Sequence, residues 1–250
     1  MRNSFKNFHF NRFLVSATIA ILISFNLFSS SLSCTIENPP DKKGTRTIYL
    51  IRHGQYDHDD PRSSEVGKEL IPLGIAQTRL LADRLKSMPV KMNSLLSSTL
   101  TRARQTAMII NEEFPELDLQ QSGLIRECTP PTWRKDVMSE TSTEELKECT
   151  KNLDEAFKKF FVPSPDENDR HDMIVCHGNV IRYFVTKILK VDTQSWLQMT
   201  TGNCGLTVVH IRSDGSMQLV SFNDLGHLPP NLQTISGLGS SQKKLVLPEN

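Results

Sequence analysis

The chain has 250 residues, 38% of them hydrophobic and 23% charged, which is typical of a globular domain with one substantial core. Its 29 lysine and arginine residues nearly balance 28 aspartate and glutamate residues, so the formal net charge is +1. This balance argues against the broad basic surface used to bind nucleic acids, and no nucleic-acid partner is expected. A local basic pocket for a small anion is compatible with it.

The first 36 residues differ from the rest of the chain. Three basic residues near the start are followed by the apolar run Phe13–Phe28 and by small residues before Cys34. This order is typical of a cleaved secretory signal peptide, but the apolar run is also almost long enough for a retained membrane anchor. Residues 1–36 therefore predict either an exported protein or one attached to a membrane at its N-terminus.

Composition also suggests where the domain begins and ends. Residues 37–45 contain two prolines, a glycine and several charges, so they are expected to form a linker. A single domain is expected over residues 46–231. Residues 232–250 are rich in small and polar side chains and are expected to form a mobile tail.

Within residues 46–231, short apolar strands alternate with longer helical patterns. Repeated strand–helix units with a hairpin at the end predict an α/β three-layer sandwich, in which helices flank a mostly parallel sheet. In chain order the predicted elements are strand Thr47–Ile51, a helix between Pro72 and Pro89, strand Leu95–Ser97, helices Thr101–Glu113 and Thr143–Phe161, strand Asp172–Cys176, a helix after Gly178, and the hairpin strands Gly205–Ile211 and Met217–Phe222.

Two histidines come directly after predicted strands, His53 after the first and His177 after strand Asp172–Cys176. In such sheets ligands bind just beyond the carboxyl ends of the strands, so both imidazoles are expected at one site. Arg52 could hold an anion while His53 attacks it. Gly54 carries no side chain, which would let backbone N–H groups approach the anion.

Further candidates follow other predicted strands. Arg102 lies at the expected start of a helix, where an anion is favoured and a guanidinium can bind two phosphate oxygens. Arg104 cannot share that face and is expected to be a solvated charge. Glu127 follows a short apolar stretch and supplies a carboxyl group, and Gly178 beside His177 repeats the histidine–glycine pattern.

Four motifs in this order resemble the signature of the histidine phosphatase (phosphoglycerate-mutase-like) superfamily, and most closely its mitochondrial serine/threonine protein phosphatases. They are Leu50–Gln55 (LIRHGQ), Ser97–Ala103 (SSTLTRA), Leu124–Glu127 (LIRE) and His177–Arg182 (HGNVIR). The resemblance implies no metal and no other cofactor. It implies that His53 is the nucleophile that becomes phosphohistidine, that Arg52, Arg102 and His177 bind the phosphoryl oxygens, with Gly54 and Gly178 beside them, and that Glu127 protonates the leaving alkoxide.

The expected activity is hydrolysis of phosphate monoesters, with phosphoserine or phosphothreonine proteins as the favoured partners. A small phosphate ester is the alternative substrate. A mutase is disfavoured, because mutases of the superfamily carry a long insertion after the acid, whereas Glu127 is soon followed by a helix. A non-catalytic phosphate-binding scaffold and a metal hydrolase built on Asp57–Asp60 are the remaining alternatives. The resemblance adds a mitochondrial membrane as the alternative location and leaves an oligomer open.

Five cysteines, at positions 34, 128, 149, 176 and 204, form no Cys-x-x-Cys pair, so zinc is not suggested. If Cys34 is removed with a signal peptide, the other four could pair in an oxidising compartment. Buried free thiols are the alternative.

Overall fold

The computed structural model describes residues 44–235. The expected signal peptide or anchor, nearly all of the expected linker and the tail beyond residue 235 lie outside these described residues. Within residues 44–235, no helix has both the length and the apolar character needed to cross a membrane. The domain continues past the expected end at Asn231, because Ile235 pairs with Gly202 and the carbonyl of Thr234 accepts a hydrogen bond from the N–H of Asn203 at 2.9 Å.

Six strands form one mixed sheet. They are β1 (Arg46–Arg52), β2 (Ser94–Ser98), β3 (Leu119–Ser122), β4 (Arg170–Cys176), β5 (Leu206–Ile211) and β6 (Met217–Asp224). Their order across the sheet is β3-β2-β4-β1-β5-β6. The first four run parallel to one another, whereas β5 is antiparallel to both β1 and β6. The predicted mostly parallel sheet with a late hairpin is confirmed.

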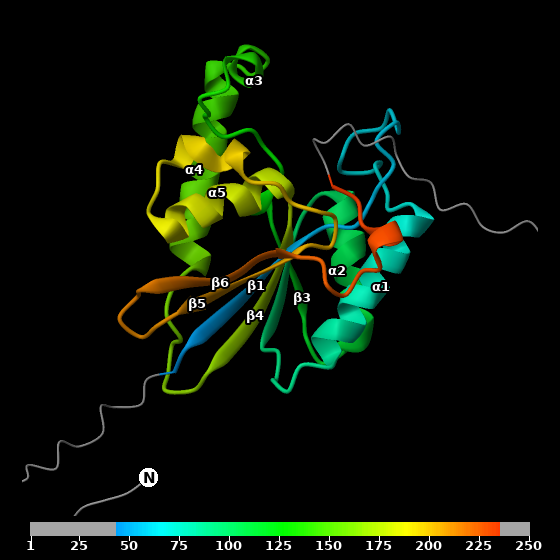
Figure 1. Cartoon of the computed structure of the whole chain (residues 1–250), viewed down its shortest axis with the longest axis vertical. Helices are drawn as coiled ribbons and strands as arrows, with labels where there is room; N and C mark the ends of the chain where they lie inside the picture. The colour runs from blue at the N-terminus through cyan, green and yellow to red at the C-terminus, as the bar shows by residue number, and fades with distance from the viewer. Residues whose placement is uncertain (1–43, 236–250) are drawn as a thin grey trace, which may run out of the picture. The chain divides into compact units, whose positions relative to one another are not determined.

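Helices cover both faces of this sheet. They are α1 (Pro72–Lys86), α2 (Thr101–Glu113), α3 (Lys135–Ser139), α4 (Thr143–Phe160) and α5 (Gly178–Leu189), with single 3-10 turns at Gly123–Ile125, Thr193–Gln198 and Pro230–Leu232. Figure 1 shows α4 and α5 on one side and α1 and α2 on the other. The predicted three-layer sandwich is therefore confirmed.

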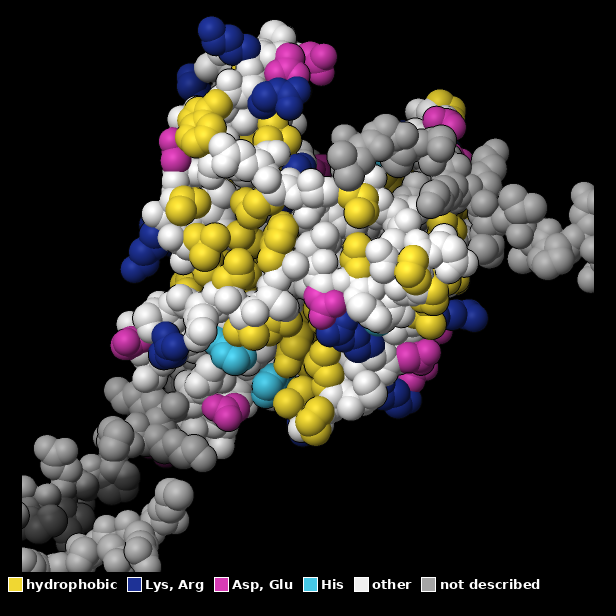
Figure 2. Space-filling view, viewed as in Figure 1, with side chains coloured by type: hydrophobic (Ala, Val, Ile, Leu, Met, Phe, Trp, Pro, Cys, Tyr) yellow, Lys and Arg dark blue, Asp and Glu magenta, His cyan; other side chains and the backbone are white. Residues whose placement is uncertain are grey.

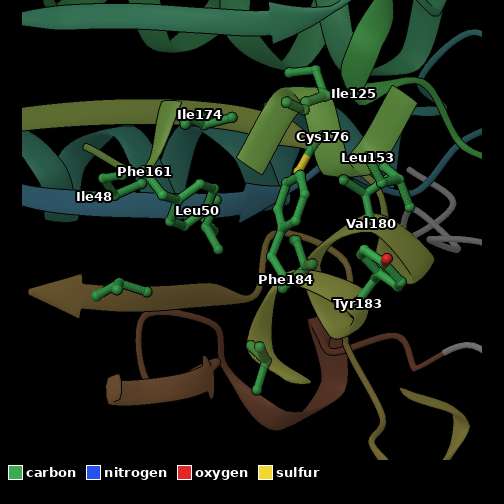
Figure 3. Close-up of a cluster of buried hydrophobic side chains, with 14 of the residues drawn as sticks. Ile48, Leu50, Ile125, Leu153, Phe161, Ile174, Cys176, Val180, Tyr183 and Phe184 are labelled. Carbon is green, nitrogen blue, oxygen red and sulfur yellow. The ribbon is translucent and has the colours of Figure 1, made fainter. Parts of the chain in front are cut away.

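Strand β1 shows why the sheet needs helices on both faces. Ile48 and Leu50 point into the core beneath α4 and α5, which Figure 3 shows in close-up. Tyr49 and Ile51 point into the second core, beneath α1 and α2. Successive side chains of a strand alternate between faces, so an uninterrupted apolar run requires cover on both.

The register of β1 against β4 places the two histidines side by side. Arg52, the last residue of β1, lies opposite Cys176, the last residue of β4. The next residues are His53 and His177, and the N–H of His53 donates to the carbonyl of Cys176 at 3.1 Å. Two parallel strands that end together thus bring both imidazoles to one edge of the sheet.

At the amino ends of the parallel strands, the buried carboxylate of Asp172 holds three strands together. Its Oδ2 accepts hydrogen bonds from the Nε of Arg46 (2.6 Å) and the Nε of Arg170 (2.8 Å), which are the first residues of β1 and β4. Its Oδ1 accepts from the Oγ of Ser94, the first residue of β2, at 2.5 Å. These charge-assisted bonds align the starts of the strands whose other ends carry the histidines.

Part of the hydrophobic surface stays open to solvent. Figure 2 shows hydrophobic side chains at the surface between α5 and β6. Met217, Leu219 and Phe222 on β6 are only partly buried there against the core, and Val220 on the other face of the strand is exposed. Strand β6 lies at the edge of the sheet, and among the helices of residues 44–235 its main contact is with α5.

Candidate active site

A pocket of about 170 Å³ lies at the carboxyl ends of the parallel strands. Strand β1 contributes its last residue and the loop after it, α2 and α5 contribute their first turns, and the loop after the 3-10 turn Gly123–Ile125 closes one side. The lining residues are Arg52, His53, Tyr56, His58, Arg102, Glu127, Gly178, Asn179, Arg182 and Thr201.

His53 has one ring nitrogen committed to the backbone and one directed at Arg102. Its Nδ1 lies 2.8 Å from the carbonyl oxygen of Gly54, which can only accept, so Nδ1 carries the proton. Its Nε2 is therefore the unprotonated nitrogen, and it accepts a hydrogen bond from the Nε of Arg102 at 3.1 Å. Burial, reinforced by the nearby Arg102, holds the pKa of His53 well below its usual value of 6.5. At neutral pH the imidazole is uncharged, and its Nε2 lone pair can attack an electrophile once Arg102 no longer donates to it.

Arg102 is the second residue of α2, so it lies in the first turn of the helix that follows β2. Its guanidinium also lies over the ring of Tyr56, with 4.7 Å from Cζ to the ring centroid. The Tyr56 ring in turn meets the His53 ring edge to face at 5.2 Å. Arg104 points outward, where its Nη2 reaches the carbonyl of Glu65 at 3.4 Å. The structure thus directs only the first of these two arginines into the pocket, as the helix spacing predicted.

Arg52 is fixed between the loop before β5 and the start of α5. Its Nη1 donates to the carbonyl of Thr201 at 2.7 Å. Gly178 lies so close that a Cβ atom there would be 3.3 Å from the Arg52 Nε and 2.9 Å from the Thr201 Oγ1. Gly178 is therefore required for this packing, since any side chain would displace the guanidinium or the threonine.

His177 is fully buried beside His53, with 5.1 Å between the two ring centroids. Its Nε2 lies 2.8 Å from the Oγ of Ser98, the last residue of β2. Its Nδ1 lies 3.6 Å from the Oε2 of Glu127, beyond hydrogen-bond distance. Burial, with Arg102 and Arg52 nearby, holds the pKa of His177 well below 6.5, so this imidazole is also neutral.

Glu127 faces the His177 imidazole from the loop after the 3-10 turn. Its Oε1 accepts a hydrogen bond from the N–H of Asn179, in the first turn of α5, at 3.1 Å. Burial raises the pKa of Glu127 above the ordinary 4.5, although Arg102 and Arg52 act in the opposite direction. About a quarter of its side chain, 27%, stays accessible. This carboxyl group can therefore both hold a proton and reach a group in the pocket.

Gly54 does not have the position expected for it. It does not line the pocket, and its N–H donates to the Oγ1 of Thr106 in α2 at 3.0 Å. A Cβ atom on Gly54 would lie 2.7 Å from the carbonyl of Gly74 and 2.9 Å from the Oγ1 of Thr78, both in α1. The predicted binding role of Gly54 is thus corrected: its lack of a side chain lets α1 pack against the loop, and its N–H is already bonded.

Five lining residues were given no role in phosphate binding from the sequence, although His58 was a candidate metal ligand within the run Asp57–Asp60. Tyr56 and His58 lie within five residues of His53, and Asn179 and Arg182 belong to the fourth motif, so closeness to a histidine was the available signal. Thr201 gave none. Arg182 is held by stacking over the Trp196 ring at 4.6 Å, and its Nη2 donates to the Oδ1 of Asn179 at 2.5 Å.

In the acidic run Asp57–Asp60, the buried carboxylate of Asp60 is bonded within its own loop. The carboxylate of Asp60 receives two hydrogen bonds from the guanidinium Nε of Arg62, at 2.9 and 3.0 Å, and one from the N–H of Lys68 at 2.8 Å. Within residues 44–235, no group of three or more His, Cys, Asp or Glu side chains is arranged to hold a metal ion.

The sequence left open whether the cysteines pair or stay as buried free thiols, and the described cysteines do both. Cys128 and Cys149 form a disulfide. Cys176 and Cys204 are buried free thiols, and burial raises the pKa of Cys204 to about 12, so this thiol stays protonated. Cys34 lies outside the described residues.

Taken together, the pocket is lined by three guanidinium groups, by the neutral imidazole of His53 and by one carboxyl group with a raised pKa, and the neutral imidazole of His177 lies buried beside it. Fixed positive charge in a small, partly desolvated pocket favours an anion of phosphate size. An imidazole with an unprotonated nitrogen can attack such an anion, and a protonated carboxyl group in the same pocket can donate to the group that leaves.

Comparison with known proteins agrees with this chemistry. Residues 48–159 and 129–225 match the model of the histidine phosphatase superfamily (branch 1). The mitochondrial serine/threonine-protein phosphatase Pgam5 of Caenorhabditis elegans is 40% identical over 198 residues, which cover 75% of this chain and 66% of that protein. The human PGAM5 is 33% identical over 203 residues, covering 78% and 68%. This chain thus spans about two thirds of the length of these relatives.

Solved structures share the fold. A phosphoglycerate mutase from Plasmodium falciparum superposes with a TM-score of 0.53 at 27% identity, covering 75% of this chain and 96% of that one. The α-ribazole phosphatase of Shigella flexneri superposes with a TM-score of 0.56 at 18% identity, covering 72% and 96%. The second likeness concerns the fold alone.

Proposed function

Because this chain belongs to the histidine phosphatase superfamily, we propose that it hydrolyses phosphate monoesters through a phosphohistidine on His53. The observation that carries the proposal is the hydrogen bonding of that ring. Its Nδ1 proton is held by the Gly54 carbonyl, so Nε2 is the unprotonated nitrogen, and it points to the Nε of Arg102 in the pocket lining. Such an imidazole is ready to attack phosphorus without first losing a proton.

In the first step, the Nε2 of His53 forms a bond to phosphorus while the bond from phosphorus to the ester oxygen breaks. Arg52 and Arg102 hold the phosphoryl oxygens, and we assign a further phosphoryl contact to His177, which lies buried beside His53 with its Nδ1 3.6 Å from Glu127. In the substrate-free site, the Arg102 Nε donates to the nucleophile itself. Substrate must therefore draw that donor onto a phosphoryl oxygen, which frees Nε2 at the moment when it is needed.

Glu127 is assigned the proton transfers. An alkoxide leaves poorly, so protonation of the ester oxygen by a positioned acid contributes roughly 10²–10⁴-fold. The raised pKa of Glu127 favours the protonated form that this step needs. In the second step the carboxylate takes a proton from water as the water attacks phosphohistidine, which returns His53 and releases phosphate.

We favour phosphoserine and phosphothreonine in proteins as substrates, because the relatives that match most of the domain are named serine/threonine-protein phosphatases. A pocket of about 170 Å³ holds the phosphoryl group, and a second pocket of about 690 Å³ that shares Glu127 with it offers a surface for the rest of a larger substrate. A small phosphate ester is the second candidate. The relatives' names also favour a mitochondrial location, and an N-terminal signal or anchor stays a prediction.

The test is to trap the intermediate. We expect brief incubation with ³²P-labelled phosphoserine peptide to yield an acid-labile, alkali-stable phosphoenzyme, and His53→Ala to lose both this label and turnover. His210→Gln is the matched control, because His210 lies on β5 away from the pocket. Turnover retained by His53→Ala would remove the proposed nucleophile.

A substrate panel separates the alternatives. Release of inorganic phosphate from phosphoserine peptides supports the protein phosphatase, and selective turnover of a small ester supports the second candidate. Transfer of the label between hydroxyls of one small molecule, without release to water, would indicate a mutase. Tight phosphopeptide binding by wild-type protein with no phosphate release would instead indicate a scaffold.

A further inference from the structure

The loop that carries Glu127 is held by side chains and not by backbone pairing. Residues 127–134 belong to no helix or strand. Residues 127–133 make no backbone–backbone hydrogen bond with any other residue in the described range 44–235. On one side, Glu127 follows Arg126, whose N–H donates to the carbonyl of Gly123 and whose guanidinium pairs with Glu65; on the other side, the loop is held by side-chain tethers.

A disulfide is the covalent tether. Cys128, the residue after Glu127, is bonded to Cys149 in α4, and their Cα atoms lie 5.7 Å apart. Cys149 is 3% exposed and packs in the core with Leu153 and Ala156 of the same helix, both fully buried. Because α4 is anchored on the sheet by that core, the disulfide fixes the loop to a rigid element immediately beside the carboxyl group.

Asn179 forms the second tether and contacts two adjacent loop residues. Its N–H donates to the Oε1 of Glu127 at 3.1 Å, and its Nδ2 donates to the carbonyl of Cys128 at 2.9 Å. Its Oδ1 accepts from the Nη2 of Arg182, which orients the amide so that Nδ2 faces the loop. One residue of α5 thus holds both the carboxyl group and the backbone of the disulfide-bonded cysteine.

A third contact lies farther along the loop. The Nε1 of the buried Trp196 donates to the carbonyls of Pro130 and Pro131 at 3.2 and 3.1 Å. These bonds hold the loop two residues beyond Cys128. Glu127 and Cys128, the two loop residues nearest the pocket, are held instead by the disulfide and by Asn179.

We propose that the Cys128–Cys149 disulfide positions Glu127 for proton transfer, so that reduction of this bond selectively slows hydrolysis of esters with poor leaving groups. The inference rests on the acid role in the proposed function. Reduction breaks the S–S bond: a dithiol gives two electrons and two protons, becomes a disulfide itself, and leaves two cysteine thiols. Neither cysteine lines the phosphate pocket, so the effect passes through Glu127.

The selectivity follows from where the other groups are anchored. His53 and Arg52 lie at the end of β1, and Arg102 lies on α2, so none of them depends on this loop. An aryl ester such as p-nitrophenyl phosphate needs little protonation of its leaving group, whereas a phosphoserine ester needs a well-placed acid. Misplacing a catalytic group by about 1 Å can cost on the order of 10²-fold.

The experiment measures kcat/KM for a phosphoserine peptide and for p-nitrophenyl phosphate in wild-type protein and in Cys149→Ser, each with and without dithiothreitol. In the variant, and in reduced wild-type protein, we expect the value for the peptide to fall by about 10- to 100-fold. The aryl ester should change by less than about twofold on the same reasoning. Dithiothreitol should not alter Cys149→Ser further.

A double-mutant cycle tests whether the disulfide acts through the carboxyl group. Glu127→Gln should itself lower the peptide rate selectively, and Cys149→Ser added to it should have no further effect. Additive losses overturn the inference, as do equal losses on both substrates. If Glu127→Gln is selective but loss of the disulfide changes neither substrate, the positioning role fails while the proposed function stands. If Glu127→Gln lowers both rates equally, the proposed acid role itself fails.

Asn179→Ala provides an arm that leaves the disulfide intact. It removes the amide bond to the Cys128 carbonyl but keeps the backbone N–H that reaches Glu127. We expect a smaller loss of the same substrate selectivity, and a greater sensitivity to dithiothreitol because one tether is already missing. If Cys149→Ser does not fold, reduction of folded wild-type and Asn179→Ala protein decides the matter, and unchanged peptide hydrolysis in both overturns the inference.

Discussion

Replacing Gly178 with alanine tests how closely the pocket constrains Arg52. The added Cβ would lie 2.9 Å from the Oγ1 of Thr201 and 3.3 Å from the Nε of Arg52. Real Cβ atoms essentially never approach another heavy atom to less than 3.0 Å, so something must move. Arg52 cannot move alone, because its Nη1 is bonded to the carbonyl of that same threonine at 2.7 Å. Both residues must therefore shift, by a few tenths of an ångström.

We expect this shift to lower kcat/KM by about 3- to 10-fold, since a displacement of about 1 Å costs on the order of 10²-fold and this one is a few tenths as large. The loss equals about 0.6 to 1.4 kcal/mol of transition-state stabilisation. Thermal stability should change little, because alanine is preferred over glycine in a helix by up to about 1 kcal/mol, which offsets the strain. Steady-state kinetics with p-nitrophenyl phosphate and a thermal melt measure the two quantities.

Gly123→Ala is the matched control, because a Cβ atom on Gly123 would meet nothing within 4 Å. It should leave both kcat/KM and the melting temperature unchanged. Wild-type kinetics in Gly178→Ala would refute the argument, because they would mean that Arg52 can shift without consequence for the reaction.

Two further predictions concern charge. Arg102→Lys keeps the charge but loses the Nε donor and the planar stacking on Tyr56, so kcat/KM should fall by about 10²-fold. Arg104→Lys is the control and should have no effect, because Arg104 points away from the pocket. A similar loss of activity in both variants would contradict the assignment of Arg102 to the pocket. With rising pH, kcat/KM for phosphoserine peptides should first increase as His53 loses its proton below pH 6.5, because burial lowers its pKa. It should then decline as Glu127, whose pKa burial raises, loses its own proton. A pH profile of Glu127→Gln should lack the alkaline decline, and a retained decline would assign that limb to another group.

The parts of the fold that leave an apolar pattern or a turn signal could be predicted from the sequence, the edge strand β6 among them, whereas β3 and α3 could not. Strands β1 and β4 and helices α1, α2 and α5 bury one or both faces, which leaves an apolar pattern in the residues. Strand β3 (Leu119–Ser122) is polar and buries none of its side chains, because it lies at the edge and is held by backbone pairing with β2. Helix α3 likewise buries no residue, so it leaves no periodic signal.

In the candidate site, the residues that could be predicted from the sequence are those placed by the sheet. Residues that directly follow a strand, such as His53 and His177, could be placed together because parallel strands share one edge. Thr201 could not, since its position depends on the path of a loop. Gly54 was misplaced because a short motif does not show which side of the backbone faces the pocket, and Thr106 takes its N–H. The pairing of Cys128 is likewise decided by tertiary packing against α4 and not by sequence spacing.

The contacts of Asp172 have a consequence for reading sequence variation in this protein. This carboxylate lies five residues before His177, roughly 16 Å away along an extended strand. A slip of β4 by one residue would turn its side chains to the opposite face, so the salt links at one end of the sheet maintain the alignment of the imidazoles at the other. A substitution among these distant polar residues would therefore lower activity as the loss of an active-site residue does, although every reacting side chain is still present.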